Sequence, residues 1–246
     1  MSPDVAASIK ARLLNLAKAH GEEFERTLTR FAAERLLFRL GKSAAYDRCI
    51  LKGASLLAVW LPDPYRTTRD VDVLASGPTD DAAIRSMIAE ICAVACPEDG
   101  LRFDLSELVV EVNRRDEEYS GKRARFHAYL GSARMRMQLD LGIGDALAAP
   151  PQEIDYPTLL EMLPAPRLRA YPRETTVAEK FEAMVKLDTA NSRMRERAVG
   201  ISCRRERLAQ RSDSTSCGRN LGSLPGTQRR AALPDRKAPL QLLGHR

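Results

Sequence analysis

The sequence predicts an α/β (α+β) fold in which a mixed β-sheet carries helices on one face. Between residues 46 and 150 the hydrophobic pattern changes between helical periodicity and strand alternation, in the order helix, strand, helix and three strands. The longest apolar runs, such as 56–61, are too short to cross a bilayer. No apolar signal segment follows the N-terminus. We therefore expect a cytoplasmic protein with no membrane partner.

Residues 1–45 are expected to form an N-terminal helical hairpin. Apolar residues recur at helical spacing over 9–17 and again over 24–37, and a glycine follows each stretch, at Gly21 and Gly41. The five cysteines form no metal-binding spacing, so we expect free thiols.

Residues 46–150 are expected to form the core. Its elements are predicted from apolar periodicity and from Gly and Pro breaks, with Gly131-Ser132 as a hairpin turn. The expected helices cover 54–60 and 80–96, and the expected strands cover 66–74, 105–112, 124–130 and 134–141.

Residues 151–195 are expected to form an incomplete helical lobe, with a strong helix from Val177 to about Asp188. The tail, residues 196–246, has no Phe, Trp or Tyr and little apolar periodicity, so we expect it to be disordered. It holds 11 basic and 4 acidic residues, which leaves 28 basic and 29 acidic residues in 1–195. The overall charge of +6 therefore belongs to the tail and says little about the folded part.

Three carboxylates are the candidate chemical centre. Asp70 and Asp72 stand at alternate positions of a predicted strand, so they share one face, about 6–7 Å apart. Asp140 lies on the polar face of the strand 134–141 and completes a triad if the two strands pair. Oxygen-only ligands of this kind suit Mg²⁺ or Mn²⁺, and such ions support phosphoryl chemistry. The alternative is that two alternating aspartates mark only a solvated strand.

Neighbouring residues favour the functional interpretation. Lys52 and Gly53 lead into Ser55 at the start of a helix, where backbone amides can bind phosphates. Arg66 and Arg69 precede the aspartate pair and can contact a triphosphate, although a salt bridge to a neighbouring carboxylate explains them equally well.

The motifs together resemble a known family. Residues 51–54 and 66–72 resemble the signature of the nucleotidyltransferase fold, and more narrowly that of the AbiEii/AbiGii toxins of type IV toxin–antitoxin and abortive-infection systems. The segments 138–145, 171–180 and 191–194 resemble later motifs of that family.

The resemblance implies a function and roles for the residues. It implies a transfer of a nucleoside monophosphate from an NTP to an acceptor, such as the RNA of tRNA, and it implies a cognate antitoxin. Asp70 and Asp72 would hold metal, Asp140 would be a third ligand or a base, and Lys180 would reach the nucleotide phosphates. A Lys180 on a solvated helix face is the alternative. The family's second small residue is here Ala54, which weakens the expectation for Ser55.

The chain departs from the family pattern after Arg195, where the family usually continues with an aromatic-rich helix that bears another Asp. We hypothesise that the reading frame shifts near Arg195 and makes the tail an out-of-frame product, whereas a native basic tail that binds RNA is the competing interpretation. Two other functions stay open. One is an inactive truncated relic that binds a nucleotide or a protein partner, and the other is a metal-dependent phosphohydrolase.

Overall fold

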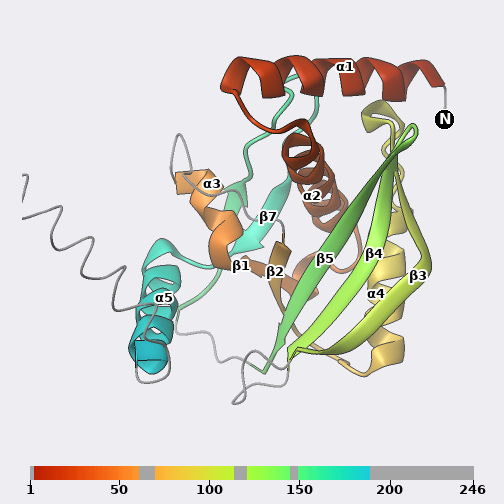
Figure 1. Cartoon of the computed structure of the whole chain (residues 1–246). Helices are drawn as coiled ribbons and strands as arrows, with labels where there is room; N and C mark the ends of the chain where they lie inside the picture. The colour runs from red at the N-terminus through yellow and green to blue at the C-terminus, as the bar shows by residue number, and fades with distance from the viewer. Residues whose placement is uncertain (1–2, 61–69, 114–120, 145–148, 189–246) are drawn as a thin grey trace, which may run out of the picture. The chain divides into compact units, whose positions relative to one another are not determined.

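A computed structural model describes residues 3–60, 70–113, 121–144 and 149–188. Within these ranges the chain is a mixed α/β protein with one seven-stranded sheet in the order β3-β4-β5-β2-β1-β7-β6 (Figure 1). The compact unit extends from Met1 to Lys186 and contains all of these strands. The predicted fold class is therefore confirmed.

The helices agree with most of the predicted segments. They are α1 (Pro3–His20), α2 (Phe24–Lys42), α3 (Leu57–Trp60), α4 (Asp81–Ala93) and α5 (Arg173–Asp188). Gly21, with φ 61°, separates α1 from α2. Helix α4 begins after Asp80, whose side chain accepts a hydrogen bond from the amide of Ala83 and so satisfies a free donor of the first turn.

The strands are β1 (Cys49–Lys52), β2 (Asp70–Ala75), β3 (Leu101–Asn113), β4 (Gly121–Leu130), β5 (Ala133–Ile143), β6 (Gln152–Asp155) and β7 (Arg167–Ala170). The predicted hairpin turn is present, because Leu130 pairs with Ala133 around Gly131, which has a φ of 58°. Strands β1, β6 and β7 were not predicted. Two of them fall within 151–195, where the sequence indicated only a helix. The domain boundaries themselves remain predictions.

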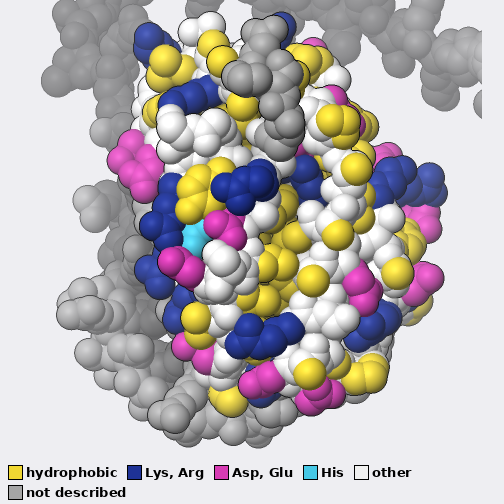
Figure 2. Space-filling model, turned by 90° about the vertical axis from the view of Figure 1, so that its right-hand side faces the viewer, with side chains coloured by type: hydrophobic (Ala, Val, Ile, Leu, Met, Phe, Trp, Pro, Cys, Tyr) yellow, Lys and Arg dark blue, Asp and Glu magenta, His cyan; other side chains and the backbone are white. Residues whose placement is uncertain are grey.

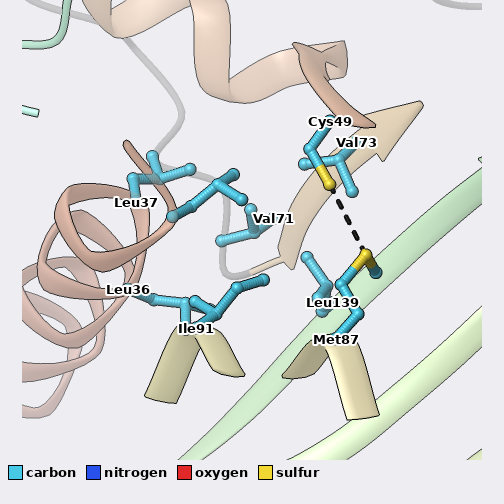
Figure 3. A pocket seen from close by; sticks show the side chains of 9 residues that line it. Leu36, Leu37, Cys49, Val71, Val73, Met87, Ile91 and Leu139 are labelled. Carbon is cyan, nitrogen blue, oxygen red and sulfur yellow. Dashed lines mark hydrogen bonds between the residues drawn. The ribbon is translucent and has the colours of Figure 1, made fainter. Parts of the chain in front are cut away.

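One face of the sheet is apolar and packs against α2 and α4. Figure 3 shows side chains of both helices meeting side chains of β1, β2 and β5. The small cavity between them has a volume of about 10 Å³. Its labelled lining residues are Leu36, Leu37, Cys49, Val71, Val73, Met87, Ile91 and Leu139. The residues that alternate with this set on β2 and β5 therefore point to the other face of the sheet.

A buried ion cluster fixes α2 to the segment before β3. Asp99 accepts hydrogen bonds from Arg39 Nη1 (2.6 Å), Arg39 Nη2 (3.1 Å) and Arg35 Nε (3.3 Å). The backbone amide of Leu101 donates to the same carboxylate. Arg35 also donates to Glu34 and to the carbonyl of Pro164. Buried charges are tolerated because each is paired and hydrogen-bonded in this way.

Glu34 belongs to this cluster and has a shifted pKa. Burial raises the pKa of the carboxyl from 4.5 to about 7, although a hydrogen bond from the amide of Leu159 and the charge of Arg35 act in the opposite direction. Desolvation penalises the charged form of a carboxyl, which accounts for the direction.

Two further expectations can be compared with the structure. The cysteines within the described ranges, Cys49, Cys92 and Cys96, are free thiols as predicted, and burial raises their pKa to about 11, 12 and 12. Of the helices in those ranges, none has the length and hydropathy needed to span a bilayer. The tail, 196–246, and the segment 66–69 lie outside the described residues.

Candidate active site

The pairing of β2 with β5 brings the three predicted aspartates together. The strands are parallel, and Asp72 lies opposite Asp140 while Asp70 lies opposite Gln138. Asp70 and Asp72 are half-buried, and the intervening Val71 is buried on the opposite face. Adjacent strands lie about 4.8 Å apart. The condition on which the triad depended, that these two strands pair, is therefore met.

A row of four charged residues crosses the sheet at this level. Lys52 on β1 lies opposite Asp72, and Arg123 on β4 lies opposite Asp140. The order along the row is therefore cation, carboxylate, carboxylate, cation. Like charges directly opposite each other destabilise a sheet, and a cation on each outer side offsets that repulsion. We call these four residues, Lys52, Asp72, Asp140 and Arg123, the charged row.

The turn after β1 lies against the start of β2. Gly53 has a φ of 75°, and a Cβ added to it would lie 2.3 Å from Oδ2 of Asp72. Any other side chain would therefore be strained and would displace this carboxylate. Ser55 is buried, and its hydroxyl donates to the backbone carbonyl of Asp70 at 3.3 Å. The predicted phosphate contacts of Gly53 and Ser55 stay predictions.

Asp140 is held by two side chains. Nε and Nη2 of Arg123 donate to its two oxygens at 2.7 Å each, and Nε2 of Gln138 lies 3.3 and 3.2 Å from the same oxygens. The side chains of Arg123 and Asp140 are 9% and 13% exposed. Hydrogen bonding to Asp140 raises the pKa of the Arg123 guanidinium, and the charges of Asp140 and Asp70 add to the effect.

Sequence reasoning did not find Arg123. A signal for it exists, because Arg123, Arg125 and His127 alternate with buried Ala124, Phe126 and Ala128 along β4. This alternation places Arg123 on the polar face of its strand, but its partner depends on how β4 and β5 align. That alignment is not visible in the pattern of either strand alone.

Three predicted site residues cannot be placed. Arg66 and Arg69 lie outside the described residues, and Lys180 lies within α5 but its side chain is not described. The neighbouring Val177 and Phe181 are exposed to 60% and 63%. Among the residues that the structure describes, no three His, Cys, Asp or Glu side chains are grouped so as to hold a metal ion.

Other charged side chains on the sheet form local pairs. Arg125 lies 2.8 Å from Glu111, and Arg134 lies 2.9 Å from Glu107. On the face that Figure 2 shows, basic and acidic side chains are interspersed. This mixture agrees with the near-neutral balance of residues 1–195.

The mixed sheet places two aspartates at alternate positions of β2 and a third on the adjoining strand β5. This arrangement agrees with the nucleotidyltransferase class that the motifs resemble. A family model described as "Nucleotidyl transferase AbiEii toxin, Type IV TA system" matches residues 35–196. The chain belongs to this family, and the resemblance seen in its motifs is confirmed.

Comparison with solved structures gives weaker likenesses. One is to a "putative nucleotidyltransferase" from H. pylori, with 12% identity, a TM-score of 0.39 and coverage of 62% of this chain and 56% of that one. Another is to JHP933 from Helicobacter pylori, with 13% identity, a TM-score of 0.39 and coverage of 62% and 55%. This chain thus spans little more than half the length of either. No curated protein matches.

Proposed function

We propose that the chain transfers a nucleoside monophosphate from an NTP to an RNA acceptor such as tRNA, with Mg²⁺ or Mn²⁺, as the toxin partner of an antitoxin. The observation that carries this proposal is the register of β2 and β5, which brings Asp70, Asp72 and Asp140 to one region of the polar face. The membership of the AbiEii family supports both the reaction class and the antitoxin.

The donor set fits a divalent ion in part. Asp70 and Asp72 offer carboxylate oxygens from one strand face, which is the donor type that Mg²⁺ and Mn²⁺ prefer. Whether Asp140 joins them depends on Arg123, which already engages both of its oxygens. When bound, the ion would supply charge neutralisation at the phosphates and activation of the attacking hydroxyl.

The chain's own residues have defined tasks in this proposal. Asp70 and Asp72 are the ligands, and Gly53 leaves room for the carboxylate of Asp72. Lys52 stands at one end of the charged row, with its ammonium group 5.8 Å from the centre of the Tyr171 ring, and in this proposal it contacts a phosphate. Ser55 keeps the start of β2 in place through the carbonyl of Asp70. Arg66, Arg69 and Lys180 remain predicted contacts to the nucleotide.

The test is a transfer assay with each of the four α-labelled NTPs, total bacterial tRNA and Mg²⁺. We expect label on RNA from the wild type and loss of about a hundredfold or more in Asp70→Asn and Asp72→Asn, because each variant removes a metal-binding charge. Asp155→Asn is the matched control, since Asp155 is an exposed carboxylate on the edge strand β6.

Other products would overturn the proposal. Release of free nucleotide or phosphate without labelled RNA would instead establish a phosphohydrolase. Binding of an NTP without any product would establish the inactive relic. Co-expression with a candidate antitoxin protein tests the partner, and we expect a cognate antitoxin to restore growth to cells that this chain inhibits.

A further inference from the structure

The pair Arg123–Asp140 is a bidentate ion pair at the candidate site. Two parallel N–H donors of one guanidinium meet two oxygens of one carboxylate, both at 2.7 Å. Bidentate pairs of this kind are among the strongest hydrogen bonds in proteins because both partners are charged and their geometry is fixed. The low exposure of the two side chains strengthens the contact further, because little water competes for it.

This contact changes the part that Asp140 can play. A divalent ion at Asp140 would compete with a guanidinium for the same oxygens, and the amide of Gln138 lies against those oxygens as well. The described residues contain no three-ligand group of His, Cys, Asp or Glu.

The guanidinium of Arg123 is placed so that it can contact a second group in addition to Asp140. The bonds to Asp140 use Nε and Nη2, so Nη1 takes no part in either of them. Arg123 stands two strands from β2, about 10 Å by strand spacing, and its side chain extends toward β2 as far as Asp140. The charge of Asp70 also acts on this guanidinium. A triphosphate that shares a metal ion with Asp70 and Asp72 would lie within reach of Nη1.

We propose that Arg123 binds the triphosphate of the nucleotide and that Asp140 is the positioning residue that holds its guanidinium, while the divalent ion is held by Asp70 and Asp72. This inference rests on the proposed function. It differs from the expectation for Asp140, which the sequence treated as a metal ligand. Arginine suits the task, because its fork can hold a carboxylate on one side and present the remaining nitrogen to a phosphate on the other.

The experiment separates metal binding from triphosphate binding in the full-length chain. Mn²⁺ alone is titrated and the free ion is followed by electron paramagnetic resonance. Inorganic triphosphate and each of the four NTPs are then titrated separately by calorimetry, with Mn²⁺ held at a saturating concentration. The single variants are Arg123→Met, Arg123→Lys and Asp140→Asn. The double variant combines Arg123→Met with Asp140→Asn, and Asp70→Asn is the reference for loss of the metal site.

The matched control is Arg125→Met. Arg125 lies on the same face of β4 two residues away, but it pairs with Glu111 and lies opposite Gln138. Loss of the Arg125 side chain should leave the affinities for Mn²⁺ and for triphosphate unchanged. The double variant leaves no charge of the pair without its partner, so it carries the same test if a single variant fails to fold.

We expect Arg123→Met and Asp140→Asn each to weaken triphosphate binding about tenfold or more, with Mn²⁺ affinity changed by less than about threefold. Arg123→Lys should recover part of the loss, because it keeps the charge but not the fork. The double variant should lose no more than Arg123→Met does, because Asp140 acts through Arg123. Asp70→Asn should lose Mn²⁺ binding.

Three results would overturn the inference. If Asp140→Asn loses Mn²⁺ as Asp70→Asn does and Arg123→Met gains it, Asp140 is a metal ligand and Arg123 its competitor. If triphosphate binding is unchanged in both single variants, the pair is only structural. A wild-type chain that binds neither Mn²⁺ nor any triphosphate would overturn the proposed function together with this inference.

Discussion

Two arginine–aspartate pairs in this protein are both bidentate but have different surroundings. Arg39 donates to Asp99 through Nη1 and Nη2, and Arg123 donates to Asp140 through Nε and Nη2. Asp99 also accepts from Arg35 and from the amide of Leu101, and Arg39 donates further to the carbonyls of Arg35 and Leu101. The first pair therefore has its hydrogen-bonding capacity used within the fold.

The second pair stands on the polar face of the sheet beside two more carboxylates. The two hydrogen bonds between Arg123 and Asp140 do not use Nη1 of the guanidinium, and both residues belong to the charged row. Both pairs are bidentate, so the contact itself does not separate them. The number of additional partners and the surface on which each pair lies do.

Removal of the Asp99 charge should have the largest effect on the free energy of unfolding in this comparison. Asp99→Asn leaves Arg35 and Arg39 without their shared buried counterion, and such losses cost about 3–5 kcal/mol of the free energy of unfolding. Urea denaturation followed by circular dichroism measures it, with exposed Asp155→Asn as the control. Equal midpoints for the two variants would contradict the structural role of the cluster.

The next largest effect comes from Glu34 in the same cluster, which should make the free energy of unfolding depend on pH. Its pKa is raised in the folded state from 4.5 to about 7, so between these values the folded chain binds more protons than the unfolded one. This contribution therefore favours folding at low pH and is lost as the pH rises toward 7. It amounts to at most about 3 kcal/mol.

The measurement is urea denaturation of the wild type and of Glu34→Gln at pH 5 and at pH 8. The glutamine can still accept from the amide of Leu159 but does not titrate, so the variant should lose less stability between the two pH values than the wild type does. Identical losses in the two proteins would show that Glu34 titrates normally.

Loss of Arg123 should have the smallest effect on stability of the three changes. Arg123→Met should lower the free energy of unfolding by about 1–2 kcal/mol, because Asp140 keeps the amide of Gln138 and lies on the polar face. The same urea titration measures it. A loss as large as that of Asp99→Asn would remove the distinction between the two pairs.

The sequence predicted the part of this molecule that depends on local patterns. The alternation of Asp70, Val71, Asp72 and Val73 identifies both the strand and the face of the carboxylates, and long amphipathic segments identify the helices. The match of Asp140 to a family motif suggested the third carboxylate, and the pairing of β2 with β5 lays it opposite Asp72.

The sequence could not predict the features that depend on long-range alignment. Strands β1, β6 and β7 are four residues each, too short for a periodic signal. Arg35 and Arg39 look like ordinary solvent-facing residues of α2 until Asp99 is seen to lie beside them. The contact of Arg123 with Asp140 needs the register of β4 and β5, which side-chain patterns alone do not fix.

The parallel pairing of β2 with β5 also has a consequence for synthesis of the chain. Between the two strands the ribosome must make all of α4, β3 and β4. Contacts between distant segments form late, since a long loop must close before they give any stabilisation. The carboxylates of a nascent chain therefore stay apart until β5 has emerged. A chain interrupted before that point would carry Asp70 and Asp72 without Asp140 beside them.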